Sequence, residues 1–378
     1  MRPLLSIAIA TKDREQYCIK TIQSILAFED NRIQITVADN SSTSMVKEFV
    51  DKLASPQVVY HYDNGPVSSI DNFNRAVEFT TGEYIMLIGD DDAILPKAIE
   101  MAEWAKENNV DSVCSKNSVV YYWPKAYDKY PNGAVIIPPS TSDLLQVDVR
   151  KELTKLVKSG LQNYLLYALP KTYHGLVRKD VLEVIKKKTG HYYGGLSPDI
   201  YSAVAVSCVA KNHYEIGEPL SIAGVCAKST SADNIVGKHS GTLENIQHLR
   251  HRSGYVFDKR IPKYYSVNTI WAESGLKALE ELDEVELLKQ FNMFYLLAQG
   301  ELHNNKFIPE IIKVETQKLL SQHNIGSLKY NIAVKKEKTK IYYRKLMQVL
   351  QAKLKNQVFQ TIENVEDIQT AINHIMKK

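Results

Sequence analysis

Residues 4–108 alternate between short apolar runs and segments of helical periodicity, and this alternation constrains the fold more than any other feature. The strand-like runs fall at residues 4–10, 33–38, 58–62 and 84–88, and the helical segments at 16–28, 46–53, 70–79 and 96–108. Strands and helices in this order predict an α/β fold, with a mostly parallel central sheet and helices on both faces.

Polar residues follow each of the four predicted strands. They occupy residues 11–14, 39–42, 63–65 and 90–92. Ligands in such sheets bind beyond the carboxyl ends of the strands. Because those ends meet at one edge of a parallel sheet, the four clusters predict a single binding site.

Three adjacent aspartates, Asp90, Asp91 and Asp92, follow the fourth strand after Gly89. Alternate residues of an extended chain share a face, so we expect Asp90 and Asp92 to converge while Asp91 faces away. Carboxylates this close repel, which raises a pKa unless a cation lies among them. Hard oxygen ligands at an open site suit Mg²⁺ or Mn²⁺. Capping of the next helix is the alternative, but Pro96 favours the first helical position and would place the cap one residue earlier.

The composition is that of an ordinary globular protein of 378 residues, long enough for one large domain and a smaller one. A net charge of +4 does not argue for nucleic acid as a partner. The four cysteines form no CxxC pair and indicate free thiols of a reducing compartment. With no secretion signal and no apolar stretch approaching about 18 residues, we expect a cytoplasmic protein that contacts membranes only at its surface.

The character of the chain changes along its length. Strands are predicted at 118–123 and 134–137, helices at 149–159 and 199–210, and a strand pair at 214–225 that is broken at 217–219. Long helical patterns at 268–282, 284–302 and 338–354 dominate the remainder. We therefore expect one domain at 1–260, with halves at 1–109 and 110–260, and a helical C-terminal domain at 261–378.

Four segments together resemble inverting family 2 glycosyltransferases. They are residues 5–11, 37–43, 82–85 leading into the aspartates, and 217–220, within a likeness that covers roughly residues 1–235. The resemblance implies the Rossmann-like GT-A fold and a nucleotide-sugar donor, with a UDP-sugar favoured. It also implies Mn²⁺ or Mg²⁺, and an acceptor hydroxyl on a glycan or lipid-linked glycan of a bacterial surface polysaccharide.

The same resemblance implies a set of donor-binding residues. A carboxylate at Asp39 can accept a hydrogen bond from a nucleotide base or ribose, and the Arg14 guanidinium can stack on a base or pair with phosphate. Where relatives have a second acid and a glycine after Asp39, this chain has Asn40 and Ser41. An Asx turn, a surface arginine and a helix cap at Asn72 remain the structural alternatives. The residues implied are Thr11, Arg14, Asp39, Asn72, Asp90 and Asp91.

Asp92 resembles the direct metal ligand, and His239 in a polar loop is a second candidate. The catalytic base that the resemblance implies is Asp199, with Pro198 in place of the usual preceding Glu. Asp199 would remove the acceptor proton as the oxygen attacks opposite the leaving nucleotide, inverting the anomeric centre. A plain helix start explains Pro198 and Asp199 as well. His174 is a candidate for lining the acceptor site.

Two further patterns each leave two interpretations open. Five aromatics between residues 121 and 130 could stack on sugar rings or belong to a strand in the core: Tyr121, Tyr122, Trp123, Tyr127 and Tyr130. The basic run 335–355 carries apolar residues at helical spacing. It could lie on an anionic membrane, or pack on the core with its basic face in solvent; the C-terminal helices could also mediate homo-oligomers.

Two rival functions also stay open. A sugar nucleotidyltransferase would need a glycine-rich phosphate loop after the first strand, and residues 10–14 contain no glycine. A non-catalytic glycan-binding or scaffolding protein on a transferase fold is the other rival. The intact aspartate triplet argues against it, whereas the change at Pro198 leaves it open.

Overall fold

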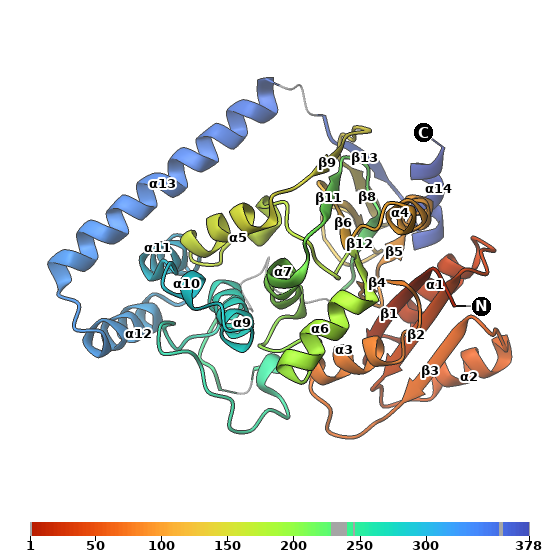
Figure 1. The fold of residues 1–378 in the computed structure, drawn as a ribbon, viewed down its shortest axis with the longest axis horizontal. Coiled ribbons are helices and arrows are strands. Elements are labelled where there is room, and N and C mark those ends of the chain that lie inside the picture. Colours follow the sequence, from red (N-terminus) through yellow and green to blue (C-terminus); the bar gives the residue numbers. More distant parts are fainter. Residues whose placement is uncertain (1, 228–239, 245, 355–357, 378) are drawn as a thin grey trace.

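Eight strands form the larger of two sheets in the computed structural model, which describes residues 2–227, 240–244, 246–354 and 358–377 (Figure 1). Their order across the sheet is β3-β2-β1-β4-β10-β6-β11-β9. The bounds are β1 Leu5–Thr11, β2 Ile33–Asp39, β3 Val58–Tyr62, β4 Tyr84–Ile88, β6 Ser112–Ser115, β9 Leu144–Gln146, β10 Gly175–Arg178 and β11 His213–Ile216.

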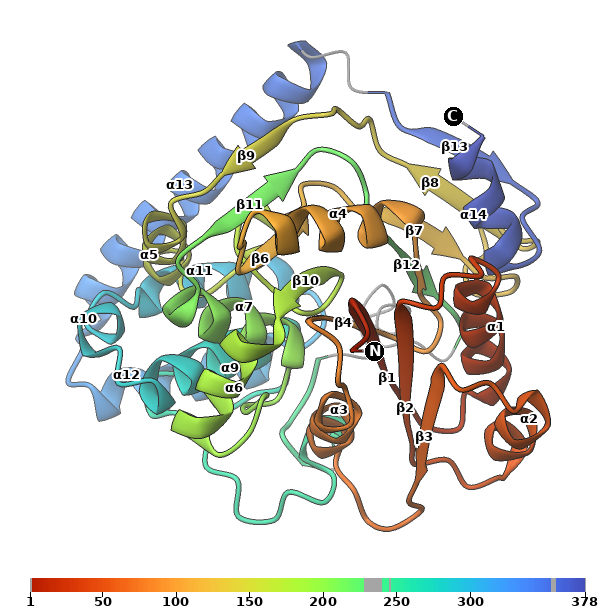
Figure 2. The same ribbon diagram turned by 45° about the vertical axis from the view of Figure 1, so that its right-hand side comes forward.

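The first four strands are parallel, as the alternation predicts, and Thr11 at the end of β1 lies opposite Asp39 at the end of β2. Successive side chains of these strands point to opposite faces. One face packs on α3 (Ser69–Glu78), and the other packs on α1 (Glu15–Leu26), α2 (Met45–Leu53) and α4 (Pro96–Glu107) (Figure 2). The α/β class with helices on both faces is therefore confirmed. β10 interrupts the parallel order, because it runs antiparallel to both β4 and β6.

A second sheet has the order β13-β8-β7-β12-β5. Its strands are β5 Ala93–Ile94, β7 Val119–Tyr122, β8 Ala134–Ile137, β12 Ser221–Val225 and β13 Gln360–Glu363. The predicted strand pair at 214–225 forms two strands, but they do not pair with each other: β11 joins the larger sheet and β12 the smaller. This places β12 beside the turn that contains the aspartate triplet, because β12 pairs with β5.

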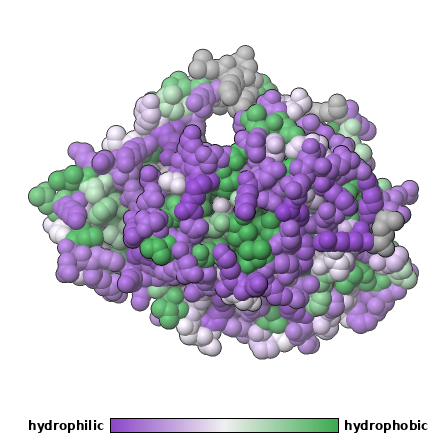
Figure 3. Space-filling view, in the orientation of Figure 1, coloured by the Kyte–Doolittle hydropathy of each residue, from purple (hydrophilic) through white to green (hydrophobic). Residues whose placement is uncertain are grey.

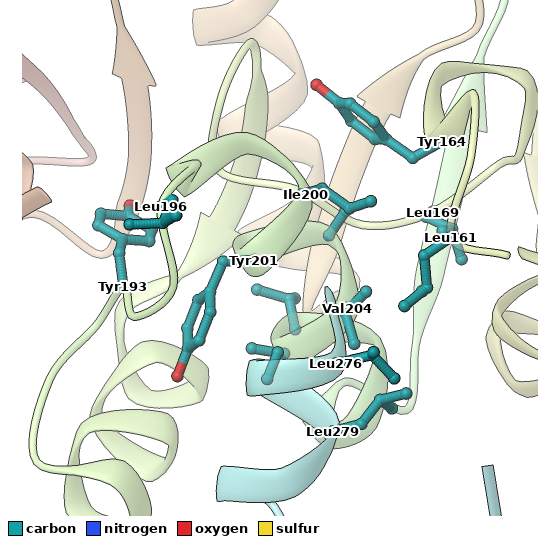
Figure 4. Close-up of a cluster of buried hydrophobic side chains, with 14 of the residues drawn as sticks. Leu161, Tyr164, Leu169, Tyr193, Leu196, Ile200, Tyr201, Val204, Leu276 and Leu279 are labelled. Carbon is teal, nitrogen blue, oxygen red and sulfur yellow. The ribbon is translucent and has the colours of Figure 1, made fainter. Parts of the chain in front are cut away.

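Helix α7 (Pro198–Val209) is buried on nearly all sides and packs against α9 (Val267–Glu281) (Figure 4). Tyr201 and Val204 of α7 and Leu276 of α9 belong to one cluster of buried side chains. Helix α9 thus packs on a helix of the segment 110–260, although α9 itself lies in the segment expected to form a separate domain. The boundary at residue 260 remains a prediction.

A region of several helices follows, as expected. Its helices after α9 include α10 Val285–Leu288, α11 Met293–Asn304, α12 Pro309–Gln322 and, near the end of the chain, α14 Ile368–Met376. Two further helices, α5 Val149–Lys158 and α6 Lys179–Thr189, precede α7. Helix α13 (Ser327–Leu354) is the longest described, at 28 residues, and lies at the edge of the molecule against α11 (Figure 1). Within the described ranges, no helix has the length and apolar character needed to cross a bilayer.

The last described residues return to the first half of the chain, which departs from the expected all-helical segment 261–378. Strand β13 pairs antiparallel with β8, and α14 lies beside α1 (Figure 2). Val365 accepts a hydrogen bond from the Tyr121 hydroxyl at 3.0 Å. A four-residue edge strand carries little periodicity of its own, so the pattern of the sequence did not reveal it.

Detaching α14 should destabilise this second sheet. Ile372 of α14 is fully buried in the apolar cluster against the second sheet. The change Ile372→Asp would either bury a carboxylate in that cluster or separate α14 from the sheet. We expect thermal unfolding to shift down by several degrees. Met376→Asp on the same helix is the control, since Met376 is 57% exposed. Equal unfolding temperatures in the two variants would contradict the packing of α14.

Candidate active site

The aspartate triplet lies in a turn after β4, and all three side chains are buried. Arg14, at the start of α1, bridges two of them: its Nη2 lies 3.0 Å from Asp90 Oδ1 and 2.6 Å from Asp91 Oδ2. Thr11 Oγ1 donates a hydrogen bond of 2.6 Å to Asp90 Oδ2. Burial raises the pKa of Asp90 and of Asp91, against the lowering effect of the Arg14 charge.

Asp92 faces a different set of partners, so the expected convergence of Asp90 and Asp92 is not what the structure shows. Asp90 and Asp91 share a guanidinium instead, because the chain turns here and does not stay extended. Asp92 Oδ1 accepts the Gly224 N–H and Oδ2 accepts the Gly89 N–H, both at 2.6 Å. Burial alone would raise the pKa of Asp92. His174 and these backbone donors outweigh that effect and hold this pKa below its ordinary value.

Two side chains from the loop before β10 complete the surroundings of Asp92. The Tyr173 hydroxyl and His174 Nε2 each lie 3.2 Å from Asp92 Oδ2. His174 Nδ1 lies 2.9 Å from the Ser221 hydroxyl of β12, which fixes the ring. The His174 backbone has φ +59°, an uncommon conformation for a residue other than glycine. His174, a candidate for lining the acceptor site, thus lies directly against the triplet.

Carboxylates such as those of the triplet are the oxygen ligands that a hard divalent ion prefers. Three carboxylates gather where Arg14 and His174 are the contacting basic side chains, so negative charge is in excess when all three are ionised. Mg²⁺ and its analogues are typically held by one or two carboxylates together with substrate phosphates. Within the described residues, no group of three or more His, Cys, Asp or Glu side chains is arranged to hold a metal by protein ligands alone.

A cavity of about 130 Å³ opens beside Asp90, at the carboxyl ends of the first strands. Four of the expected donor-binding residues line this cavity: Thr11, Arg14, Asn72 and Asp90. Its basic side chains are Lys12, Arg14 and Arg250. Asn72 is tied in place, because its amide donates to the Thr11 and Ala38 carbonyls at 3.2 and 3.0 Å. The lining is Ala10, Thr11, Lys12, Arg14, Asn40, Val67, Ser68, Ser69, Asn72, Phe73, Asp90 and Arg250.

Asp39 is fully buried and does not line this cavity, although the next residue, Asn40, does. Its Oδ1 accepts the Ser41 N–H and its Oδ2 accepts the Tyr60 hydroxyl, each at 2.8 Å. The first contact is the Asx turn that the sequence left open as the structural alternative. Both oxygens therefore have protein donors, and a role of Asp39 in donor binding stays a prediction.

Asp199 occupies the first turn of α7, behind Pro198. The pKa of Asp199 is raised to about 6, mainly because the carboxyl group is buried. The His174 charge lowers this pKa, the Asp92 charge raises it, and the Asp199 N–H and the Lys171 charge lower it. The same imidazole interacts with both Asp92 and Asp199, so the predicted base lies within electrostatic reach of the triplet. A carboxylate that titrates near neutral pH is suited to accept a proton from a hydroxyl group.

The structure adds residues that the sequence pattern did not single out. Tyr173, Gly224 and Arg250 reach the site from segments far from the triplet, and no local signal marks them. The Cys226 N–H donates to Asp91 Oδ2 at 3.2 Å. His239, the second metal candidate, lies outside the described residues.

Three of the five aromatics after residue 120 are buried, namely Tyr121, Trp123 and Tyr130. Tyr121 and Trp123 are buried beside α14, which favours the core interpretation for both. Trp123 Nε1 also donates a 2.9 Å hydrogen bond to the Asp91 carbonyl. Trp123 therefore holds the backbone of the aspartate turn, whereas the Tyr121 hydroxyl bonds to Val365.

Residues 6–145 match the family model described as Glycosyl transferase family 2. A segment of 141 residues is 29% identical to an Escherichia coli (strain K12) protein named as a colanic acid biosynthesis glycosyl transferase, WcaA. The match covers 35% of this chain and 50% of WcaA, so it spans about half the length of that relative.

Two solved structures are similar to this chain at low identity. S. aureus TarS 1–349 in complex with UDP-GlcNAc is 13% identical with a TM-score of 0.48, over 82% of this chain and 75% of TarS. The mannosyltransferase PcManGT from Pyrobaculum calidifontis, in complex with GDP-Man and Mn²⁺, is 14% identical with a TM-score of 0.39, over 90% and 88%.

Proposed function

Because the chain carries a glycosyl transferase family 2 domain, we propose that it moves a sugar from a nucleotide-sugar donor to an acceptor hydroxyl with inversion. One observation carries this proposal. A cavity with basic side chains adjoins Asp90, and a carboxylate of raised pKa, Asp199, lies within electrostatic reach of Asp92 in the same triplet. A donor and an acceptor could thus meet at the triplet.

The cavity is suited to the nucleoside diphosphate part of the donor. Lys12, Arg14 and Arg250 present positive charge to a diphosphate, and Thr11 and Asn72 hold the strand ends that form its floor. We favour a UDP-sugar, on the resemblance that the motifs carry. Arg14 would then contact the phosphates and Asp90 together.

We further propose Mn²⁺ or Mg²⁺ as the cofactor. Asp92 would be the direct ligand, in place of its contact with His174, with Asp91 as its neighbour in the triplet. When bound, the ion would neutralise charge on the diphosphate leaving group. The excess of carboxylates over basic side chains supports this assignment.

Asp199 acts as the general base in this proposal. The acceptor hydroxyl gives its proton to the Asp199 carboxylate while its oxygen forms a bond to the anomeric carbon. The bond from that carbon to the diphosphate breaks, and the nucleoside diphosphate leaves from the opposite face. Because attack and departure occur on opposite faces in one displacement, the anomeric configuration inverts.

We propose as the acceptor a glycan, or a lipid-linked glycan, of a bacterial surface polysaccharide, and the relative named for colanic acid biosynthesis supports this class. A cytoplasmic location would give the site access to nucleotide sugars. Both statements remain proposals for the whole protein, because the match covers about half of that relative.

A thermal-shift panel of UDP-, GDP- and dTDP-sugars, each with and without Mn²⁺, tests the donor and the metal together. We expect one donor to raise the unfolding temperature, and Mn²⁺ to increase the shift. Asp92→Ala should abolish the metal-dependent part. Asp51→Ala is the control, because the Asp51 side chain is 60% exposed on α2. Failure of every nucleotide sugar and every free nucleotide would overturn the proposal and favour a non-catalytic protein.

A further inference from the structure

Helix α13 carries a row of large apolar side chains on its solvent side. We call them the outer stripe, and each is between 42% and 73% exposed. In the space-filling view, separate apolar patches lie among hydrophilic surface at the upper left, where α13 runs (Figure 3). The outer stripe consists of Leu328, Ile332, Tyr342, Tyr343, Leu346, Val349 and Leu350.

The outer stripe occupies one side of the helix, and the opposite side holds α13 to the body. Leu328, Ile332, Tyr342, Leu346 and Val349 are spaced so that they fall on one face. Val334 and Ile341 lie on the other side, in a buried cluster with α11. Arg344 points inward as well, and its Nη1 donates to the Tyr167 hydroxyl at 2.8 Å.

This arrangement decides between the two interpretations of the basic run. Packing on the core with a basic face in solvent accounts for Ile341, which is 2% exposed. It does not account for Leu346, Val349 and Leu350, which are 56%, 52% and 42% exposed. The helix therefore has two apolar sides, and within the described part of the chain no member of the outer stripe belongs to a buried apolar cluster.

Lysines lie within and on both flanks of the outer stripe. Lys335 interrupts the stripe, and Lys329 and Lys336 border one side. Lys345 borders the other side together with Lys338, which pairs with Glu301 at 2.6 Å. The single acid of α13, Glu337, is 6% exposed and pairs with Lys340 at 2.8 Å. The exposed side of α13 thus combines apolar side chains with positive charge.

A second copy of the chain would be a poor partner for this surface. The spacing of the stripe is that of a coiled-coil seam, but the charged residues beside it are all lysines. Two such helices would place Lys335 inside the seam and would offer no acid to the lysines on its flanks, and both features disfavour pairing. A surface of negative charge above an apolar layer complements both features.

We propose that the outer stripe of α13 docks the protein on an anionic phospholipid bilayer. The apolar side chains enter the boundary between head groups and acyl chains, and the flanking lysines lie among the phosphates. Tyrosines such as Tyr342 and Tyr343 suit this depth, because they present an apolar ring and a polar tip. The inference does not depend on the proposed transfer reaction.

Co-sedimentation of the full chain with vesicles tests the proposal. We expect binding to vesicles of phosphatidylcholine with phosphatidylglycerol to exceed binding to phosphatidylcholine alone by on the order of tenfold or more, since each lysine near the surface contributes. High salt should reduce this difference by screening. Equal binding to both vesicle types, or to neither, would overturn the proposal.

Variants locate the contact. Leu346→Asp with Val349→Asp, and separately Lys335→Glu with Lys336→Glu, should each abolish the preference for anionic vesicles. Val256→Asp and Lys289→Glu are the matched controls, because Val256 is 82% exposed and the Lys289 side chain 65% exposed elsewhere. All of these positions are exposed, so unfolding temperatures should stay at the wild-type value. A dimer in solution that Leu346→Asp with Val349→Asp dissociates would show that a second copy covers the stripe and would overturn the proposal.

Discussion

The Asp199→Asn variant is expected to transfer sugar about 100- to 10,000-fold more slowly than the wild type, the range that general bases contribute. An amide has nearly the same shape as the carboxylate but cannot accept the acceptor proton. Asp199 does not line the cavity beside Asp90, where we propose that the donor binds, so the nucleotide-sugar affinity should stay unchanged. A turnover assay and a donor titration on the same protein separate these two quantities.

The pH dependence of turnover gives an independent check on Asp199. The base must be ionised, so the wild-type rate should fall as the pH drops through about 6 and level off above it. Burial and Asp92 raise this pKa, whereas His174 and Lys171 lower it. Asp180→Asn is the control, since the Asp180 side chain is 67% exposed. A wild-type rate in Asp199→Asn would assign the base to another residue.

The Gly224→Ala variant is expected to lose stability and donor binding together. A Cβ at position 224 would lie 1.8 Å from the Asp91 carbonyl oxygen, which is backbone and cannot rotate away. We expect the free energy of unfolding to fall by about 1–3 kcal/mol, as for other overpacked sites. The shift should also disturb Asp92, because the Gly224 N–H donates to its Oδ1.

Thermal unfolding and nucleotide titration of Gly224→Ala measure the two effects. Gly326→Ala is the matched control, because a Cβ there meets no atom within 4 Å. If Gly224→Ala behaved like Gly326→Ala in both measurements, the aspartate turn would not depend on this close approach of two backbone segments.

Local patterns were sufficient for the first half of the fold. The strands at 33–38, 58–62 and 84–88 appear at or within one residue of the predicted bounds. A strand of a parallel sheet is marked by a short run of apolar and aromatic residues, whatever surrounds it. The carboxyl ends of β1 and β2 lie in register at Thr11 and Asp39, so a shared edge followed from parallel pairing alone. The gathering of Thr11, Arg14 and Asp90 around one cavity was therefore predictable from the sequence. Asn72, on α3, was expected there only from the family resemblance.

The partners of those residues were not predictable in the same way. Nothing local to residue 14 indicates that its guanidinium bridges Asp90 and Asp91, a contact that spans 76 residues or more. The return of β13 to β8 and the place of His174 against Asp92 are also long-range pairings. Such contacts depend on which surfaces meet after the elements have formed.

By itself, the sequence determined the fold class, the site edge and the candidate acid residues, because strand periodicity and motif spacing act over a few neighbouring residues. The tertiary structure decided which carboxylate faces which partner, how burial shifts the pKa of Asp199, and that α13 presents apolar side chains to solvent. The physical reason is the same in each case. Burial and charge–charge interactions depend on distances through space, and these arise only when segments remote in the chain pack together.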